Sequence, residues 1–527
     1  MNMQGQNALL EVKNLSVGIS RPNDFLTIID NCSFSIATGE IVALVGESGC
    51  GKSITSLSVS RLLPPAARIT GGEMLFYRSG GEEKTDLCLL DEKELCQIRG
   101  KEIAMIFQEP RQSLNPLMRI GSQIAETLQL HNGKAGKEKT QAEISYEVLQ
   151  ILRQLNFPNP EKITAAYPHQ LSGGMCQRVM IAIAAICRPK LLIADEPTSS
   201  LDSENQNNII ELLAQINREF GSAVLFISHD LSLARRFSTR TLVMQKGRII
   251  DEGISESMFS SPANPYTAQL VAAASGMGKH RSGFDSNAAN SSNAAKPFIS
   301  VRDLSCSYIS RSFGLFGKRE EKPVLKSINL DIAAGEIFGL AGESGGGKST
   351  LARCILGLVS YSGDIFIDGQ LRQNAAAKPG KPGCVQMVFQ EPGSSLSPTK
   401  KIGWLLEEPL VMHRIGTPAE RERMVDNMLN MIGLEAMHKT RLVRELSGGQ
   451  KQRACIGRAL MLKPKMLIAD EATSALDVFS GSQILNLFSE LRKSLGLTIL
   501  FISHNMEATE KLCDRFAIMR DGKLQFK

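Results

Sequence analysis

The segment Gly46–Ser53 reads GESGCGKS, and a second copy, GESGGGKS, stands at Gly342–Ser349. An apolar run of strand length, 41–45, precedes the first copy, and residues 54–63 after it contain no Gly or Pro and predict a helix. A strand, a glycine-rich turn, Lys-Ser and a helix are the context in which G-x-x-x-x-G-K-[ST] predicts a phosphate-binding loop. A glycine-rich turn that binds nothing is the alternative, and the second copy argues strongly against it.

The residue types in these two loops suit phosphate binding. Glycines let backbone N–H groups approach phosphate oxygens without a Cβ in the way, and the helix N-terminus adds a positive partial charge. Lys52 is expected to reach the β and γ phosphates, and the Ser53 hydroxyl to bind Mg²⁺. The loop residues expected to bind are Gly46, Ser48, Gly49, Gly51, Lys52, Ser53 and Ile54, then Gly342, Ser344, Gly345, Gly347, Lys348, Ser349 and Thr350.

Size and composition are those of an ordinary globular protein. The chain has 527 residues, of which 43% are hydrophobic and 22% charged, and this length suits two large domains. A net charge of +6 is small for the length, so bulk charge gives no case for nucleic-acid binding. The eleven cysteines are scattered without a C-x-x-C pair, which argues against a disulfide framework and against a zinc site.

The sequence contains no segment long enough to span a membrane. Its longest uninterrupted apolar run, Val179–Cys187, is far shorter than the roughly 20 residues that a transmembrane helix needs. Residues 1–15 lack the basic start and apolar stretch of a secretory signal. We therefore expect a chain kept in the cytoplasm that reaches a membrane only through a partner.

The second half of the chain repeats the first, motif by motif. ATGEIVALVGESG returns as AAGEIFGLAGESG, QLSGGMCQR as ELSGGQKQR, and LLIADEPTSSLD as MLIADEATSALD. The repeat predicts two homologous domains, 1–271 and 298–527, joined by the Ala-, Ser- and Asn-rich segment 272–297, whose composition is that of a flexible linker.

Apolar, strand-length runs alternate with helical stretches in each half. This alternation predicts an α/β fold with a mostly parallel sheet covered by helices. The strand pattern disappears over 112–170 and 394–444, which read mainly as helices. We therefore expect a helical subdomain inserted into each α/β domain.

In each half, an apolar run of strand length ends in two acids. The segments are LLIADE at Leu191–Glu196 and MLIADE at Met466–Glu471. The carboxyl end of a buried parallel strand lies at the ligand edge of the sheet. Asp195 and Asp470 are therefore expected to bind Mg²⁺ through water. Glu196 and Glu471 are expected to orient and deprotonate the attacking water. A pair of acids at a solvated strand end is the alternative.

Two further polar residues recur at strand ends. His229 and His504 follow apolar runs, and the repetition favours a contact with the γ-phosphate over a structural role. Gln108 and Gln390 follow the runs IAMIF and QMVF, where an amide can touch the metal or the attacking water and also sense the helical subdomain.

With the LSGG segments beside these motifs, the chain resembles the nucleotide-binding domains of ABC transporters over nearly its whole length. The resemblance implies two P-loop NTPase domains that form an intrachain dimer and bind two ATP molecules with Mg²⁺. In that family the LSGG segment caps the ATP held by the opposite domain. Carried over, Ser172, Gly173 and Gly174 would cap the nucleotide on Lys348, and Ser447, Gly448 and Gly449 the one on Lys52.

Two segments resemble the peptide/nickel importer subfamily in particular. These are FQEP-x-x-SL-x-P, present twice, and NPYTAQL at Asn264–Leu270. The resemblance implies two permease subunits as membrane partners, an extracytoplasmic solute-binding protein, and a peripheral position at the cytoplasmic face of the inner membrane. It leaves the solute open between peptides, glutathione, nickel and metal–ligand complexes. A soluble tandem ABC protein acting on ribosomes is the less favoured alternative, because the long charged interdomain helices of that class are missing.

The chain departs from the family pattern in a few places. An aromatic residue usually stacks on adenine, and Tyr308 fits that place in the second half, whereas Ile19 occupies it in the first. Base–aromatic stacking is worth about 1–3 kcal/mol, so we expect weaker nucleotide binding on the first domain. Met175 replaces the usual signature glutamine, and Ala472 stands where the first half has Pro197.

Overall fold

The chain folds into two compact units, Met1–Ala274 and Ser275–Lys527, in a computed structural model. The structure describes residues 8–21, 24–78, 84–132, 139–198, 203–275, 297–311, 319–343, 345–372, 384–389, 392–474 and 476–526.

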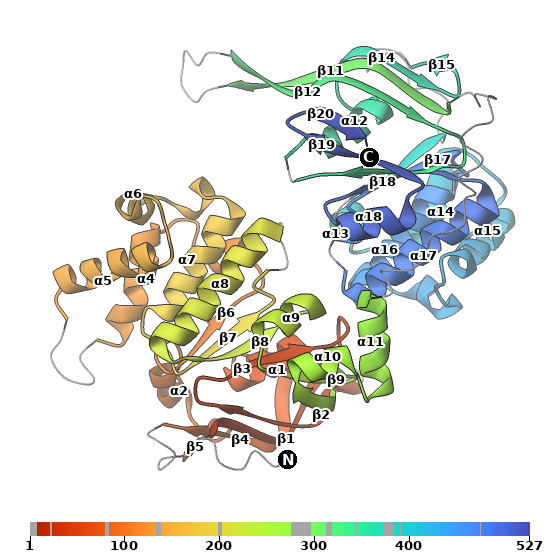
Figure 1. Cartoon of the computed structure of the whole chain (residues 1–527). Coiled ribbons are helices and arrows are strands. Elements are labelled where there is room, and N and C mark those ends of the chain that lie inside the picture. The colour runs from red at the N-terminus through yellow and green to blue at the C-terminus, as the bar shows by residue number, and fades with distance from the viewer. Residues whose placement is uncertain are drawn as a thin grey trace. The chain divides into compact units, whose positions relative to one another are not determined.

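A six-stranded sheet with the order β10-β9-β3-β8-β7-β6 forms the centre of the first unit (Figure 1). Every neighbouring pair is parallel except β9 and β10. The strands β7 and β8 are fully buried, as the apolar runs in the sequence require. The bounds are β3 Ile41–Val45, β6 Ile103–Ile106, β7 Leu191–Asp195, β8 Ala223–Ile227, β9 Arg240–Gln245 and β10 Arg248–Ile254.

A second, antiparallel sheet with the order β2-β1-β4-β5 covers one face of the first. Its strands are β1 Ala8–Arg21, β2 Asp24–Ala37, β4 Ala67–Tyr77 and β5 Lys84–Asp86. Residues of both sheets, among them Val12, Ile36, Leu44 and Leu225, form one buried hydrophobic cluster. Sequence reasoning did not find this sheet.

Helices cover the other face of the parallel sheet, and the described residues between β6 and β7 form helices and connecting turns with no strand, as predicted. In Figure 1, α4, α5 and α6 gather at one side of the unit. The bounds are α1 Lys52–Val59, α2 Glu92–Ile98, α3 Pro110–Ser113, α4 Ile120–Leu130, α5 Gln141–Gln154, α6 Pro160–Ala165, η1 Pro168–Gln170, α7 Gly173–Ala185, α8 Ser203–Phe220, α9 Leu231–Phe237, α10 Ser255–Ser260 and α11 Pro265–Ser275.

The second unit repeats both sheets. The six-stranded sheet has the order β16-β17-β18-β13-β19-β20, and the antiparallel sheet the order β12-β11-β14-β15. The strand bounds are β11 Ile299–Arg311, β12 Arg319–Ile332, β13 Ile337–Ala341, β14 Ser362–Ile367, β15 Gln370–Leu371, β16 Val385–Val388, β17 Met466–Asp470, β18 Thr498–Ser503, β19 Arg515–Arg520 and β20 Lys523–Phe526.

The helices of the second unit follow the same plan, and the prediction of an α/β fold with an inserted helical subdomain is confirmed for both halves. The bounds are α12 Lys348–Leu356, α13 Pro392–Ser395, α14 Ile402–Met412, α15 Pro418–Met431, η4 Ala436–Thr440, η5 Val443–Glu445, α16 Gly448–Leu460, α17 Val478–Leu495 and α18 Met506–Leu512. Within the described residues, this unit has no counterpart of α10 and α11.

The end of the first unit bears on the expected linker. Helix α11 runs to Ser275, so the expected linker 272–297 overlaps its last residues, and 276–296 lie outside the described part of the chain. No described helix is both long and apolar enough to cross a membrane.

Candidate functional site

The two phosphate loops have the backbone geometry that their sequence demands. Each connects a buried strand to a helix that begins at the lysine, Lys52 or Lys348. Gly51 and Gly347 precede these lysines with φ of 114° and 106°, a conformation that favours glycine. A Cβ on Gly46 would lie 2.2 Å from the Met244 carbonyl oxygen. The loops are therefore tight cradles of backbone N–H groups.

Both loop lysines are folded back onto their own loop. The Nζ of Lys52 donates to the carbonyls of Gly46 at 2.8 Å and Glu47 at 2.9 Å. Lys348 does the same with Gly342 at 2.7 Å and Glu343 at 2.8 Å. Burial lowers the pKa of Lys348, opposed by the charges of nearby carboxylates. Each ammonium group is thus held inside the loop, where a phosphate would have to meet it.

The serine after each lysine meets the first acid of the strand-end pair. The Ser53 Oγ donates to Asp195 Oδ1 at 3.2 Å, and Ser349 Oγ donates to Asp470 Oδ1 at 3.1 Å. Burial and the neighbouring Glu196 charge raise the pKa of Asp195 to about 6, against the hydrogen bonds from serine hydroxyls. The structure therefore brings together, in both units, the hydroxyl and the carboxylate expected to serve the metal.

The second acid of each pair lies close to the histidine predicted at a neighbouring strand end, and Glu196 also contacts the predicted glutamine. The Gln108 Nε2 donates to Glu196 Oε2 at 2.8 Å, and His229 Nδ1 lies 3.4 Å from the same oxygen. In the second unit, His504 Nδ1 lies 3.7 Å from Glu471 Oε2. The structure thus joins Gln108, Glu196 and His229 in one cluster.

The backbone at the second acid is unusual. Glu196 has φ of 46° and Glu471 has φ of 48°, in the left-handed region that non-glycine residues seldom adopt. Both residues turn the chain sharply where a buried strand ends. Backbone strain of this kind is found at functional sites, and its repetition in both units fits that pattern.

The histidines keep these glutamates charged. Burial disfavours the Glu196 carboxylate, but the hydrogen bond and charge of His229 outweigh it and hold the pKa of Glu196 below its usual value. Burial lowers the pKa of His229 while Glu196 raises it, and the net direction is upward. The hydrogen bond to His504 lowers the pKa of Glu471, against burial. Each carboxylate can therefore accept a proton at neutral pH.

The LSGG segments form helix N-termini. Ser172 caps α7 by accepting from the Met175 amide at 3.3 Å, and Ser447 caps α16 by accepting from the Gln450 amide at 3.3 Å. The glycines that follow, Gly173, Gly174, Gly448 and Gly449, begin the two helices. Each of these segments is expected to cap the nucleotide held by the opposite unit, so the nucleotide-capping role stays a prediction.

The remaining predicted residues lie in the loops, in the first turns of α1 and α12, and on β1 and β11. Ser48, Gly49 and Gly345 are exposed, Ile54 is half-buried and Thr350 is buried. Tyr308 is 40% exposed and pairs with Lys322 across β11 and β12, whereas Ile19 is half-buried opposite Leu26. Ser344 and Gln390 lie outside the described residues.

One neighbour of the first site was missed from the sequence. Ser56 Oγ donates to Asp195 Oδ2 at 3.4 Å. Its spacing of one helical turn from Ser53 was an available signal.

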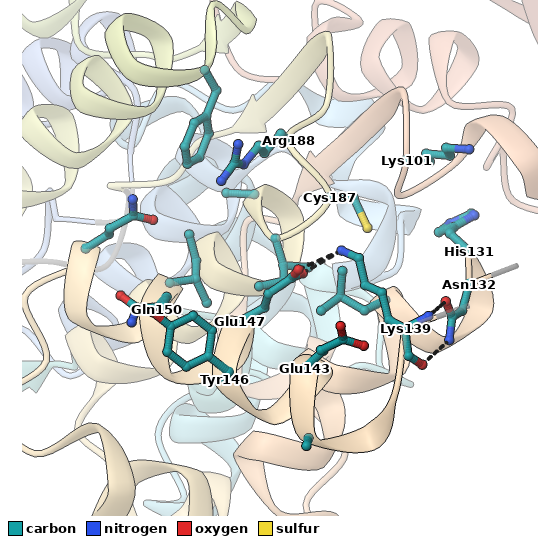
Figure 2. A pocket seen from close by; sticks show the side chains of 17 residues that line it. Lys101, His131, Asn132, Lys139, Glu143, Tyr146, Glu147, Gln150, Cys187 and Arg188 are labelled. Carbon is teal, nitrogen blue, oxygen red and sulfur yellow. Dashed lines mark hydrogen bonds and ion pairs between the residues drawn. The ribbon is translucent and has the colours of Figure 1, made fainter. Parts of the chain in front are cut away.

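A separate cavity of about 1010 Å³ lies between α5 and the ends of α7 and α8 (Figure 2). Two of its cations are already engaged: Lys139 Nζ lies 2.7 Å from Glu147, and the Arg188 guanidinium lies 5.3 Å from the centroid of the Phe220 ring. No residue of the phosphate loops or of the acid pairs lines it, so it is not the predicted site.

Comparison with known proteins identifies the architecture. The ABC transporter family profile matches residues 29–199 and 325–474. The glutathione import ATP-binding protein GsiA of Pectobacterium atrosepticum is 39% identical, over 99% of this chain and 86% of that protein. GsiA of Escherichia coli (strain K12) is 38% identical, over 98% of this chain and 85% of that protein. A solved dimeric ATP-binding cassette, in a post-hydrolysis state with ADP and Pi, covers 47% of this chain and 99% of its own, with 29% identity and a TM-score of 0.41.

These matches cover both halves and both phosphate loops. The prediction of a tandem ABC-type ATPase that serves an importer is confirmed, and the ribosome-associated alternative is not favoured. The chain therefore belongs to the ABC transporter family.

Proposed function

We propose that each unit binds one ATP with Mg²⁺, at Lys52 and Ser53 in the first and at Lys348 and Ser349 in the second. The Gln108–Glu196–His229 cluster supports this proposal, because it holds a charged carboxylate next to Asp195, which bonds to Ser53 of the first loop. The two units are then expected to close on two ATP molecules, each capped by the LSGG segment of the other unit.

The residues present fit Mg²⁺. A serine hydroxyl and a carboxylate lie within hydrogen-bond distance of each other in each unit, and oxygen ligands of this kind suit Mg²⁺ when phosphates and water complete the shell. No described group of three or more His, Cys, Asp and Glu side chains could hold an ion by itself. When bound, Mg²⁺ would neutralise developing negative charge on the phosphate oxygens.

The side chains of each unit are proposed to take separate roles in ATP hydrolysis. Lys52 would leave the loop carbonyls for the phosphates, and Glu196 would accept a proton from the attacking water. Gln108 and His229 fix the Glu196 carboxylate from two directions and so orient that water. In the second unit, Lys348, Glu471 and His504 take the same parts, and we expect Gln390 to match Gln108.

We further propose that closing and reopening of the two units drives a pair of membrane permeases, with the chain at the cytoplasmic face of the inner membrane. The curated relatives are named for glutathione import, which supports glutathione or another small peptide as the solute delivered by a binding protein. Nothing in those names favours nickel.

The solute proposal is tested by reconstitution. In membranes that hold the chain, its permeases and the binding protein, glutathione is expected to raise ATP hydrolysis at least about threefold over the solute-free rate. Phosphate release is the measurement, and a dipeptide and nickel are the comparisons. Stimulation by nickel and not by glutathione would contradict the proposal.

The aromatic asymmetry gives a second test. In a full chain with Lys52→Ala, which leaves one working site, Tyr308→Ala is expected to weaken ATP binding about tenfold because adenine loses its stacking partner. Binding of inorganic triphosphate, which has no base, is expected to stay unchanged. The matched change, Ile19→Ala in a Lys348→Ala chain, is expected to shift ATP affinity less than about twofold. Equal losses in the two chains would contradict the assignment.

A further inference from the structure

The two helices that begin at the LSGG segments carry an arginine at the same place, Arg178 on α7 and Arg453 on α16. In the second unit, other parts of the protein hold the guanidinium group of this arginine. Arg453 Nη1 donates to the Ile432 carbonyl at 2.7 Å, and Nη2 donates to Gln483 Oε1 at 3.0 Å. Arg453 therefore joins α16 to the C-terminal end of α15 and to α17.

The first unit keeps the arginine but has lost the partners of its guanidinium group. Helices α8 and α17 match without a gap, and Asn208, which is one methylene shorter, stands at the place of Gln483. In the turns after α5 and α15, Asn156 stands at the place of Gly433. No described residue accepts a hydrogen bond from the half-buried Arg178 side chain or forms an ion pair with it.

The change from glycine to asparagine keeps Arg178 from the position that Arg453 takes. Asn156 has φ of 57° and Gly433 has φ of 66°, so both turns place this residue in the left-handed region. A Cβ on Gly433 would lie 2.6 Å from Arg453 Nη1. The Cβ of Asn156 therefore takes up space that the guanidinium group needs if it is to reach the Leu155 carbonyl, the counterpart of the Ile432 carbonyl.

A cavity of about 430 Å³, which we call the Arg178 cavity, lies between α7, α8 and the turn after α5. Two guanidinium groups line it against one carboxylate, which is exposed, so the cavity has a net positive charge. Neither guanidinium group has a partner among the described side chains. A volume in this range is typical of sites for small ligands. The polar residues that line the cavity are Asn156, Arg178, Asn208, Glu211, Gln215 and Arg218.

The groups in the Arg178 cavity suit an oxyanion. A guanidinium group presents a planar fork of N–H donors that pairs with two oxygens of a carboxylate or phosphate group, and such charge-assisted bonds are strong. The side-chain amides of Asn156 and Asn208 have no hydrogen bond within the described chain and can donate to further oxygens. An apolar ligand would leave both cations without a partner, which is unfavourable.

We propose that the Arg178 cavity binds a small oxyanion, through a phosphate or a carboxylate group. The bound anion joins α7 to α8, as Gln483 joins α16 to α17 in the second unit. No residue of the phosphate loops lines this cavity, so the anion site is separate from the proposed ATP sites and does not rest on them.

The test uses the full chain with Lys52→Ala and Lys348→Ala as the parent, so that the phosphate loops compete less for anions. Inorganic phosphate and glutathione, which carries carboxylates, are titrated by calorimetry at constant ionic strength. At least one of them is expected to bind with a Kd below about 5 mM. Arg178→Gln is expected to weaken this binding at least about tenfold, and Arg178→Lys at least about threefold, because lysine lacks the planar fork.

A second variant closes the anion site and keeps the arginine. Asn156→Gly together with Asn208→Gln gives Arg178 the surroundings that Arg453 has, and this variant is expected to bind neither phosphate nor glutathione in the cavity. Its unfolding temperature without anion is expected to equal or exceed that of the parent, because the guanidinium group gains protein partners. As a control, Arg235→Gln removes the same charge from an exposed arginine on α9 and is expected to leave anion binding unchanged.

The two probes also separate the sources of the anion. Tighter binding of phosphate assigns a phosphate ligand and tighter binding of glutathione assigns a carboxylate ligand, and both results support the oxyanion site. Equal binding by the parent and the Arg178→Gln chain would overturn the inference, as would no binding of either probe up to about 10 mM. Anion binding that persists in the Asn156→Gly, Asn208→Gln chain, or a lower unfolding temperature of that chain, would also overturn it.

Discussion

Replacing both Glu196 and Glu471 by glutamine is expected to lower ATP turnover about 100-fold to 10,000-fold while ATP stays bound. Glutamine keeps the size of the side chain but cannot accept a proton from water. The loop lysines and the Ser–Asp pairs are untouched, so binding is expected to persist. Phosphate release gives the rate, and nucleotide retained after gel filtration gives the trapped ATP.

A matched control comes from the same chain. Glu211→Gln alters an exposed carboxylate on α8 and is expected to leave turnover unchanged. Single changes at Glu196 or Glu471 show whether one intact base supports hydrolysis. Retained hydrolysis in the double variant would contradict the role assigned to both glutamates, whatever the single variants show.

Most of this site follows from the sequence because its parts are local patterns. The Lys52 loop needs its glycines for reasons of backbone geometry, and Asp195 and Glu196 come directly after four apolar residues of a buried strand. Parallel strands bring such ends to one edge of a sheet. The Gln108–Glu196–His229 cluster therefore forms where the ends of three strands lie together, and the sequence predicted each of these strand ends.

The parts that were missed depend on contacts between distant segments. Sequence reasoning missed the antiparallel sheet because β1 carries register shifts between Val12 and Leu15 and between Val17 and Gly18. Such shifts break the alternation of apolar and polar residues by which a strand is recognised in a sequence. The left-handed backbone of Glu196 has no sequence signal, since glycine would be the usual choice there.

The proposed capping of each nucleotide by the opposite unit predicts the second large effect. Ser447 caps α16 and would meet the ATP held by Lys52, so Ser447→Arg would place a bulky cation where the γ-phosphate has to fit beside a helix N-terminus. In the Glu196→Gln, Glu471→Gln background, ATP stays bound and can be photolabelled with an azido analogue. Peptide mapping by mass spectrometry then assigns the label to one half of the chain.

The labelled half decides between a composite and a self-contained site. Ser447→Arg is expected to reduce label in 1–271 at least about tenfold relative to label in 298–527, because Ser447 is proposed to cap the first unit's nucleotide. Ser172→Arg is expected to shift the ratio the opposite way. The ratio of label in the two halves decides the question, and the total label does not, because a failure of the two units to close would weaken ATP binding at both sites. If each serine change depletes label in its own half, each unit binds ATP by itself and the crossed arrangement is wrong.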